Sequence, residues 1–374
     1  MANPIQSSKS SKGEFTQVPE ASRGRGHGRA TLADVALQAG VTTMTVSRFL
    51  RSPERVAVNT AEKITQALQA TSYSPNLQAG SLASGRSQAV AVIVPNIAHS
   101  IFADTLHGLG LGLQSAGLQM LVASTGYSLA QEEQQVRTVL GWAPAAVVVT
   151  GRKHLPATQQ LLLAAQQRGT PVVELWDQSP AGESHDFQQI GFDHAQVGAA
   201  QAQALMERGC TQLAFIDVAV EEDFRAHERA QGFMAKAHSA GVSAKLLVAG
   251  AGDAVAQGGL CFAAWYAQHK TPACRGVGFA NDLLGTGALL RANSLGCEIP
   301  QQLQLLGFGD FLAARYCSGG LSTMHIDGES MGQACAQYIV QQRIKSPLLT
   351  KTRPRQLVMQ PRLIWREFKS NFGR

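Results

Sequence analysis

The sequence has none of the features that mark several broad classes of protein. No run of about 18 apolar residues is present, so a transmembrane helix is not expected. The opening residues, MANPIQSSKSSKGEF, have no apolar segment of the secretory-signal type, so we expect a cytoplasmic protein. No CxxC pair occurs, which favours free thiols over a disulfide framework or a zinc site. The six scattered cysteines are Cys210, Cys261, Cys274, Cys297, Cys317 and Cys335.

Motifs of the common enzyme classes are missing as well. The chain contains no GxSxG, Walker A or HExxH motif, and its ten histidines show no metal-ligand spacing. Gly108-Leu-Gly-Leu-Gly112 lacks the GxGxxG spacing and lies in a helical pattern. The sequence therefore lacks the phosphate-binding loop that a nicotinamide-dependent oxidoreductase would need. We therefore expect no enzymatic activity, no metal and no cofactor.

Charge is unevenly distributed along the 374 residues, whose net charge is +6. Residues 1–88 carry ten Lys/Arg against five Asp/Glu, residues 89–342 carry thirteen against twenty, and residues 343–374 carry nine against one. A basic N-terminal part on an acidic body is typical of a phosphate-binding module joined to a second function. Solubilising termini are the alternative, and for residues 343–374 both interpretations stay open.

The N-terminal segment 1–29 is rich in Ser, Gly, Lys and Arg and has few large apolar residues. Such a composition predicts a disordered basic tail. Its run Arg23-Gly-Arg-Gly-His-Gly-Arg29 is either a plain flexible tail or a non-specific phosphate contact.

Residues 30–75 have the pattern of three short helices. Thr31-Leu-Ala-Asp34 reads as a capping box, the first helix has an apolar stripe, and Gly40 ends it. A second helix is expected over about 43–50, and Asn59 is expected to cap a third. Two helices joined by a glycine turn describe a helix-turn-helix unit. Its apolar residues are Leu32, Val35, Ala36, Ala39, Val46, Leu50, Ile64 and Leu68.

From residue 89 onward, apolar runs alternate with helical stretches. This order predicts an α/β fold with doubly wound parallel sheets, and the number of strands favours two lobes separated by a cleft. The expected strands are 89–94, 119–123, 145–150, 172–175, 189–192, 213–217, 245–249, 276–280 and 304–308.

Three stretches of the N-terminal part carry a family resemblance. Thr31-Leu-Ala-Asp-Val-Ala and Gly40-Val-Thr-Thr-Met-Thr-Val-Ser-Arg48 resemble the DNA-binding head of the LacI/GalR family of transcriptional regulators, and Tyr73-Ser-Pro-Asn76 resembles the boundary that opens its hinge. The variant Thr-Thr-Met-Thr-Val-Ser-Arg-Phe-Leu-Arg-x-Pro-Glu is most similar to the gluconate operon repressor branch. The resemblance implies a two-lobed, periplasmic-binding-protein-like core.

The resemblance assigns DNA contacts residue by residue. Thr43, Met44 and Arg48 fall on base-reading positions, where an arginine pairs bidentately with guanine. For Met44, packing in the core is the alternative. Three hydroxyls are expected to donate to phosphates, which position the head without reading sequence. They belong to Thr31, Thr42 and Ser47.

The segment 76–88 resembles the family's hinge. Asn76 is expected to cap a hinge helix, and Leu82 stands where a leucine wedges into the minor groove. Leu77 replaces an arginine common in relatives, and Gly80 costs about 1 kcal/mol relative to alanine in a helix. We therefore expect a hinge that becomes helical only on DNA. An ordinary linker with an inert Leu82 is the alternative.

The core is expected to span residues 89–366, with lobe 1 over 89–193 and 327–345 and lobe 2 over 194–326 and 356–366. The chain is expected to cross between the lobes near Asp193, Ile326 and Gln356.

One arginine stands out in the second lobe. Arg225-Ala-His-Glu-Arg229-Ala-Gln-Gly-Phe233 resembles the family motif whose second arginine grips the effector. A guanidinium matches the geometry of a carboxylate, so the resemblance implies that Arg229 binds an acid. The alternative is an ion pair on a helix surface with Glu222 or Asp223.

Other residues are expected at the cleft because ligands of such sheets bind beyond the carboxyl ends of the strands. Gly309 stands at the family's usual aspartate position, so Asp310 either substitutes with a shift or binds nothing. Ala254 stands where some relatives place an aromatic, which predicts an aromatic-poor site. The expected effector-binding residues besides Arg229 are Ser100, Phe102, Arg152, Lys153, Asp193, Asn281 and Asp310.

Together these features predict a homodimeric DNA-binding repressor, controlled by gluconate or a related sugar acid bound between the lobes. A regulator of the same family that responds to a neutral or phosphorylated sugar is the main alternative. A sugar-binding protein without DNA contact is the second, and it would keep its function after loss of residues 1–88.

Overall fold

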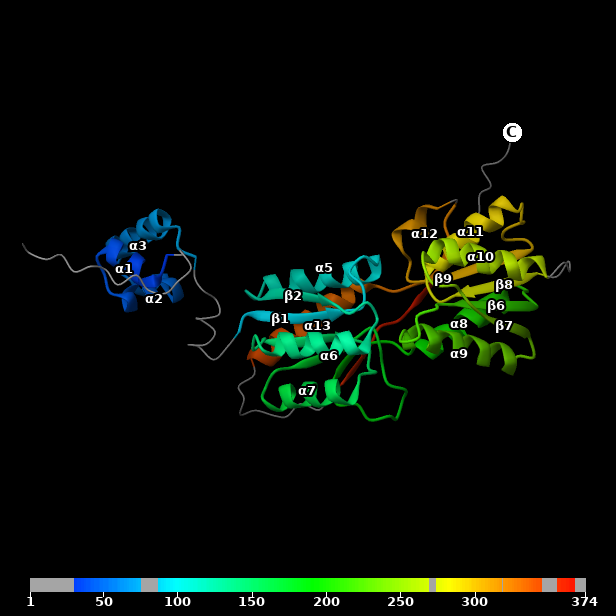
Figure 1. Ribbon diagram of the computed structural model, residues 1–374, viewed down its shortest axis with the longest axis horizontal. Helices are drawn as coiled ribbons and strands as arrows, with labels where there is room; N and C mark the ends of the chain where they lie inside the picture. The colour runs from blue at the N-terminus through cyan, green and yellow to red at the C-terminus, as the bar shows by residue number, and fades with distance from the viewer. Residues whose placement is uncertain (1–29, 75–86, 269–273, 318, 345–354, 367–374) are drawn as a thin grey trace, which may run out of the picture. The chain divides into compact units, whose positions relative to one another are not determined.

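The computed structural model describes residues 30–74, 87–268, 274–317, 319–344 and 355–366, which form an N-terminal head and a larger core (Figure 1). The expected tail, residues 1–29, and most of the expected hinge lie outside the described residues. Among the described residues, no helix combines the length and apolar character that crossing a bilayer requires. None of the six cysteines, all of which are among the described residues, forms a disulfide bond.

The head is a three-helix unit, as predicted. Its elements are α1 (Leu32–Ala39), α2 (Thr43–Arg51), the short 3-10 helix η1 (Pro53–Arg55) and α3 (Val58–Thr71). The predicted apolar stripes meet in one core, whose buried members are Val35, Ala36, Ala39, Val46, Ile64 and Ala67. This arrangement leaves the opposite face of α2 to solvent.

Local signals set most of the head's helix ends. Thr31 and Asp34 form the predicted capping box, and Gly40 ends α1 in the left-handed region at φ 67°. The prediction that Asn59 caps α3 is wrong. The N-cap residue is Ala57, two positions before Asn59, and the helix begins at Val58. Ala57 makes no side-chain cap hydrogen bond, so this helix starts without a side-chain acceptor.

The first lobe holds a six-stranded parallel sheet in the order β11-β5-β4-β3-β1-β2. Helices α5 and α13 pack against one another, and α6 contacts α7. Successive side chains of β1 serve two separate cores: Val90, Val92 and Val94 face one, Ala91 and Ile93 the other. The strands are β1 (Ala89–Val94), β2 (Gln119–Ser124), β3 (Ala146–Thr150), β4 (Val172–Leu175), β5 (Gln188–Gly191) and β11 (Gln356–Val358); the helices are α5 (Ser100–Gln114), α6 (Leu129–Leu140), α7 (Pro156–Gln167) and α13 (Gly328–Ile344).

The second lobe repeats this plan with a sheet in the order β12-β10-β9-β8-β6-β7, in which β12 is antiparallel to β10. The two sheets with helices on both faces confirm the predicted fold class. The strands are β6 (Gln212–Asp217), β7 (Ser243–Val248), β8 (Arg275–Phe279), β9 (Leu303–Phe308), β10 (Ser322–His325) and β12 (Arg362–Ile364); the helices are α8 (His194–Glu207), α9 (Phe224–Ser239), α10 (Ala254–Ala267), α11 (Asp282–Ser294) and α12 (Leu312–Tyr316).

Three segments carry the chain between the lobes (Figure 1). The first two lie between β5 and α8 and between β10 and α13, close to the expected crossovers. The third corrects the prediction, which put residues 356–366 in lobe 2. Gln356–Val358 pairs in parallel with β5 of the first sheet, and the chain crosses only afterwards to form β12. Three residues, of which two are apolar, are too few to show in sequence which sheet they join.

Two glycines let helices α8 and α9 cross closely. A Cβ on Gly198 of α8 would overlap the backbone carbonyl of Arg229 on α9, and a Cβ on Gly232 would overlap that of Ala195. The glycines therefore bring the start of α8 against the middle of α9.

Replacing Gly198 by alanine is expected to destabilise the core by about 1–3 kcal/mol, because the added methyl group overpacks a backbone contact. Gly110→Ala on α5 is the matched control. Its Cβ would meet only a methionine methyl at 3.8 Å, so it should leave stability unchanged or raise it by up to about 1 kcal/mol. Urea unfolding of the core measures both, and equal midpoints for the two variants would contradict the close crossing.

Candidate functional site

The outward face of α2 presents the predicted base-reading side chains. Thr43 and Arg48 are exposed and Met44 is 73% exposed, whereas Val46 on the inner face is fully buried. The alternative that Met44 packs in the core is thereby excluded. The helix carries Arg48 and Arg51 and no acidic residue, so its exposed face is cationic.

The three hydroxyl groups that we expect to donate to phosphates differ in whether they already take part in hydrogen bonds within the head. The Thr31 hydroxyl donates to Asp34 Oδ2 at 2.8 Å, so its one proton is already used in the capping box. The Thr42 oxygen lies 2.9 Å from Thr45 Oγ1 and accepts from the Thr45 amide. Ser47 is partly exposed beside Arg48. Capping therefore competes with phosphate donation at Thr31. The remaining predicted DNA contacts, Asn76 and Leu82, lie outside the described residues.

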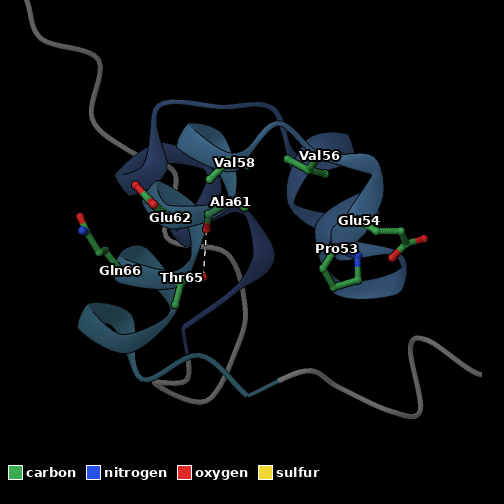
Figure 2. Close-up of a pocket in the computed structure, with 8 residues that line it drawn as sticks. All are labelled: Pro53, Glu54, Val56, Val58, Ala61, Glu62, Thr65 and Gln66. Carbon is green, nitrogen blue, oxygen red and sulfur yellow. Dashed lines mark hydrogen bonds between the residues drawn. The ribbon is translucent and has the colours of Figure 1, made fainter.

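A shallow groove lies on another part of the head, between η1 and α3 (Figure 2). Val56, Val58 and Ala61 give it an apolar floor, and Glu54 and Glu62 stand at its rim. Carboxylates repel phosphates, so this groove is unsuited to face DNA.

A cavity lies between the two lobes of the core, at the carboxyl ends of the strands where the sheet geometry predicts ligands. We call it the inner cavity. Its walls come from the turns after β1, β2, β6, β8 and β9, from the residue after β4, from helices α5, α8 and α9, and from the end of β9. The lining residues are His99, Ile101, Phe102, Tyr127, Trp176, His194, Asp223, Arg225, Arg229, Asn281, Phe308 and Phe311.

Arg229 is the most unusual group in this cavity. Its side chain is buried, its Nη1 lies 2.7 Å from His194 Nδ1, and its Nη2 donates to the Ala280 carbonyl at 2.7 Å. The guanidinium stacks 3.9 Å above the Phe308 ring, and its Nε has no hydrogen-bond partner among the described residues. No carboxylate of the described residues forms an ion pair with it, so the predicted alternative pairs with Glu222 or Asp223 are excluded. Burial lowers the pKa of Arg229 to about 10, which leaves it charged at neutral pH.

The rest of the inner cavity is largely aromatic, which corrects the expectation of an aromatic-poor site. Phe102 meets Trp176 edge-on at 5.7 Å, and the two rings share the cavity wall with Tyr127, Phe308 and Phe311. The residue type at Ala254 could not indicate this, because the five rings come from four other segments of the chain. The cavity thus combines aromatic ring faces with the buried guanidinium of Arg229, and Asp223 and Arg225 also line it.

A second, outer cavity adjoins the first through Tyr127 and Arg225. It is lined by Lys153 and by several acidic groups, among them Glu132 and Asp177. Next to the outer cavity, ion pairs connect the two lobes. Glu228 of lobe 2 lies 2.8 Å from Arg152 Nη2 and 2.7 Å from Lys153 Nζ of lobe 1.

A second tie crosses the cleft nearby. Glu222 accepts from the backbone amide of Leu129, the first residue of α6, at 2.9 Å. Arg225 Nη1 donates to the Thr150 carbonyl at 3.2 Å. These contacts hold the two lobes against one another at the mouth of the cleft.

The structure brings four predicted effector residues to the cavities: Phe102, Arg229 and Asn281 to the inner one and Lys153 to the outer one. Arg152 instead joins the ion pairs between the lobes. Ser100 begins α5 and does not line either cavity, and Asp193 caps α8 by accepting from the Gln196 amide.

Asp310 is also absent from the cavity walls. Left-handed backbone at Gly309 (φ 113°) and Asp310 (φ 57°) turns its carboxylate toward Arg366, at 2.6 Å, and His325, at 2.9 Å. Arg315 lies 3.1 Å away. The aspartate is therefore held in an ion cluster of lobe 2, which resolves the open choice in favour of a structural role.

Sequence reasoning missed several residues of the inner cavity. Trp176 directly follows the apolar run 172–175, and Phe308 ends the run 304–308, so the carboxyl-end rule applied to every strand points to both. His194 is the neighbour of the predicted Asp193. Tyr127 and Phe311 lie in turns without a distinguishing motif.

A buried ionic cluster adjoins the outer cavity, because Glu132 belongs to both. His154 Nδ1 lies 2.5 Å from Glu132 Oε1, and its Nε2 lies 3.3 Å from Glu174 Oε1, with the histidine side chain 1% exposed. Burial disfavours the charged imidazole, but the two carboxylates outweigh it and raise the pKa of His154 to about 9.

Two family models match the chain. The model of bacterial regulatory proteins of the lacI family matches residues 31–76, and that of the periplasmic binding protein-like domain matches residues 202–367. The chain is 32% identical over 315 residues to the HTH-type transcriptional regulator GntR of Pseudomonas aeruginosa, which covers 84% of this chain and 89% of that protein. It is 28% identical to the HTH-type transcriptional regulator IdnR of Escherichia coli K12, over 83% of this chain and 91% of that protein.

Solved structures agree with these matches. A LacI family transcriptional regulator from Silicibacter pomeroyi is 29% identical, with a TM-score of 0.79 over 90% of this chain and 98% of that one. The lac repressor dimer bound to operator and the anti-inducer ONPF is 18% identical, with a TM-score of 0.74 over 91% and 99%, and supports the fold alone. The predicted resemblance is confirmed, and these relatives are transcriptional regulators rather than enzymes.

The His154 cluster predicts a pH dependence of core stability. Because the folded pKa, about 9, exceeds the ordinary value of 6.5, the stabilisation is fully present below pH 6.5 and is lost as the pH rises through 9. Urea unfolding at pH 6.5 and pH 9 should show a larger fall for the wild type than for His154→Gln. His107→Gln, at an exposed position of α5, is the control and should behave as the wild type. An equal fall in all three proteins would refute the charged cluster.

Proposed function

This chain belongs to the LacI family of bacterial regulatory proteins, and we propose that it is a repressor gated by a small sugar acid, gluconate or a related acid. The head binds operator DNA, and the acid binds in the inner cavity. The observation that carries the proposal is Arg229, a buried guanidinium without an ion-pair partner among the described residues, in the wall of that cavity.

The exposed face of α2 supports the DNA-binding part. In a helix-turn-helix the second helix enters the major groove with its N-terminal residues at base edges. Thr43, Met44 and Arg48 occupy that face, with Met44 suited to a thymine methyl group and Arg48 to guanine. Thr42 and Ser47 then flank the phosphates, and Asn76 and Leu82 remain proposed contacts of the hinge.

The charge of the inner cavity supports an anionic effector. A buried cation that forms no ion pair is costly, and an incoming carboxylate offsets that cost with bidentate, charge-assisted hydrogen bonds. The aromatic walls suit the apolar C–H faces of a sugar chain. A neutral sugar would leave the guanidinium without an ion-pair partner, so the sugar acid is preferred over the neutral ligand.

A homodimer is proposed from the edges of both sheets. β2 and β7 are edge strands, and they expose the apolar side chains of Leu121, Val122, Leu246 and Val248. Edge strands with exposed apolar residues are covered in stable proteins. A second copy that covers both edges would place two heads on a pseudo-palindromic operator in the cytoplasm.

The two lobes can couple effector binding in the inner cavity to DNA binding by the head. Effector binding in the cleft changes how firmly the lobes close, and the movement reaches the hinge segment 76–88 that precedes β1. A coupling free energy of about 1–3 kcal/mol shifts operator affinity by about 5- to 150-fold. We propose that the effector favours the state that releases DNA.

Arg48→Ala is expected to remove base discrimination worth about 1–3 kcal/mol while leaving residual, salt-sensitive binding. Arg51→Ala is the matched control, because this arginine of the same helix already donates to the Ser47 carbonyl at 3.2 Å. It should weaken binding to all duplexes alike. A randomised-site selection followed by anisotropy titrations measures both variants, and an unchanged sequence preference in Arg48→Ala would exclude it as a base reader.

Arg229→Met is expected to weaken gluconate binding by about 10- to 150-fold, the worth of hydrogen bonds to a charged group. Operator binding should persist, since the residue lies in the core and not in the head. Isothermal titration calorimetry measures the effect, with Arg291→Met at an exposed position of α11 as the control. Normal gluconate binding by Arg229→Met would remove this arginine from the site.

A further inference from the structure

His194 is the group that directly contacts the Arg229 guanidinium. It is the first residue of α8, its side chain is 1% exposed, and its ring packs 4.7 Å from Phe192 and 6.1 Å from Phe308. Its two ring nitrogens lie in short contacts, 2.7 Å from Arg229 Nη1 and 2.7 Å from the Trp176 carbonyl.

These two contacts permit one protonation state of the imidazole. A guanidinium only donates hydrogen bonds, so His194 Nδ1 must accept from Arg229. A carbonyl only accepts, so His194 Nε2 must carry the proton and donate to Trp176. The ring is therefore the neutral Nε2–H tautomer. Burial and the neighbouring arginines lower the pKa of His194 well below its ordinary value, which agrees with this state.

The backbone on the far side of the ring is fixed as well. Trp176 adopts φ 65°, a left-handed conformation that bulky residues seldom adopt, and its amide donates to the Ile190 carbonyl at 3.0 Å. Residues in such conformations persist where the surroundings hold them, and they are common at ligand sites. Trp176 thereby presents its carbonyl to His194 at a defined place.

The donors left on Arg229 then have a fixed direction. One N–H of Nη1 goes to His194, one of Nη2 goes to Ala280, and the plane stacks on Phe308. The Nε–H has no partner among the described residues, and each terminal nitrogen uses one of its two N–H groups in the contacts just named. A planar fork held on three sides is preorganised for a planar carboxylate.

We propose that His194 is a positioning residue that fixes the Arg229 fork and thereby makes the inner cavity select a sugar acid over the matching neutral polyol. The inference rests on the proposed function, because it assumes that the ligand binds at Arg229. It goes further in assigning the discrimination between acid and alcohol to the histidine, which need not touch the ligand itself.

Two variants and a control separate positioning from packing. His194→Leu removes the acceptor, whereas His194→Asn keeps an acceptor oxygen near the place of Nδ1. Phe192→Leu loosens the same aromatic cluster without removing a partner of Arg229, and Phe192 does not line the cavity. Thermal unfolding of the full chain shows whether each variant folds.

The probes are D-gluconate and D-glucitol, which differ in a carboxylate against a hydroxymethyl group. Titration calorimetry and competition on the full chain should show that His194→Leu loses about tenfold or more of its gluconate affinity with glucitol binding unchanged. His194→Asn should recover part of the preference for the acid, and Phe192→Leu should keep it. Parallel weakening of both ligands in His194→Leu, or no weakening, overturns the proposal.

A ligand-free measurement keeps the inference testable if the wild type binds no sugar acid, a result that would refute the proposed effector class. In the ¹⁵N spectrum of histidine-labelled protein, His194 should be the neutral Nε2–H tautomer, and its Nδ1 signal should shift in Arg229→Met. A charged ring, the opposite tautomer, or an unchanged Nδ1 signal overturns the positioning role by itself.

Discussion

The central constraint in the core is the burial of the Arg229 guanidinium, which lies on α9 against the start of α8 and the ring of Phe308. Arg229 keeps its charge inside the protein with a histidine nitrogen, a backbone carbonyl and the face of Phe308 as its contacts. A buried charge without an ion-pair partner costs free energy, and the protein tolerates that cost only because each contact is fixed by the fold. Gly198 and Gly232 allow α8 and α9 to approach, which sets His194 beside Arg229. The cost itself is the reason that an anion is the ligand we propose.

Contacts between the two lobes provide a means by which ligand binding at this site could change the rest of the core. Glu228 bridges Arg152 and Lys153 across the cleft, and Glu222 caps the start of α6 in the opposite lobe. Partly buried ion pairs of this kind depend on distance, so a small change in lobe spacing alters several of them together. A ligand that adds contacts to both lobes shifts this balance by its differential affinity for the two states. In the proposed homodimer, a second copy covers the edge strands β2 and β7. Movement of one lobe would then also move the surface that the partner contacts.

Much of this architecture could be predicted from sequence, because it rests on local patterns. The capping box at Thr31 and Asp34, the glycine turn at Gly40 and the apolar runs of the strands each act within a few residues. The site resisted prediction where it depends on distant segments. Trp176, Phe308 and Tyr127 come from separate segments of the chain, so no local pattern indicates that their rings share a wall. Asp310 was expected near the ligand, but left-handed backbone at 309–310 turns it toward Arg366, a residue 56 positions away. The short strand β11 joined the first sheet through pairing that three residues cannot signal.

The central claim is that an acid bound between the lobes controls the grip of the head on DNA. The most direct measurement is the affinity of the full chain for a duplex recovered from a randomised-site selection, determined by fluorescence anisotropy with and without saturating gluconate and related sugar acids. The account predicts a steeply salt-dependent complex that at least one acid weakens by about 5- to 150-fold. An operator affinity that stays the same in the presence of every acid that binds the protein would contradict it.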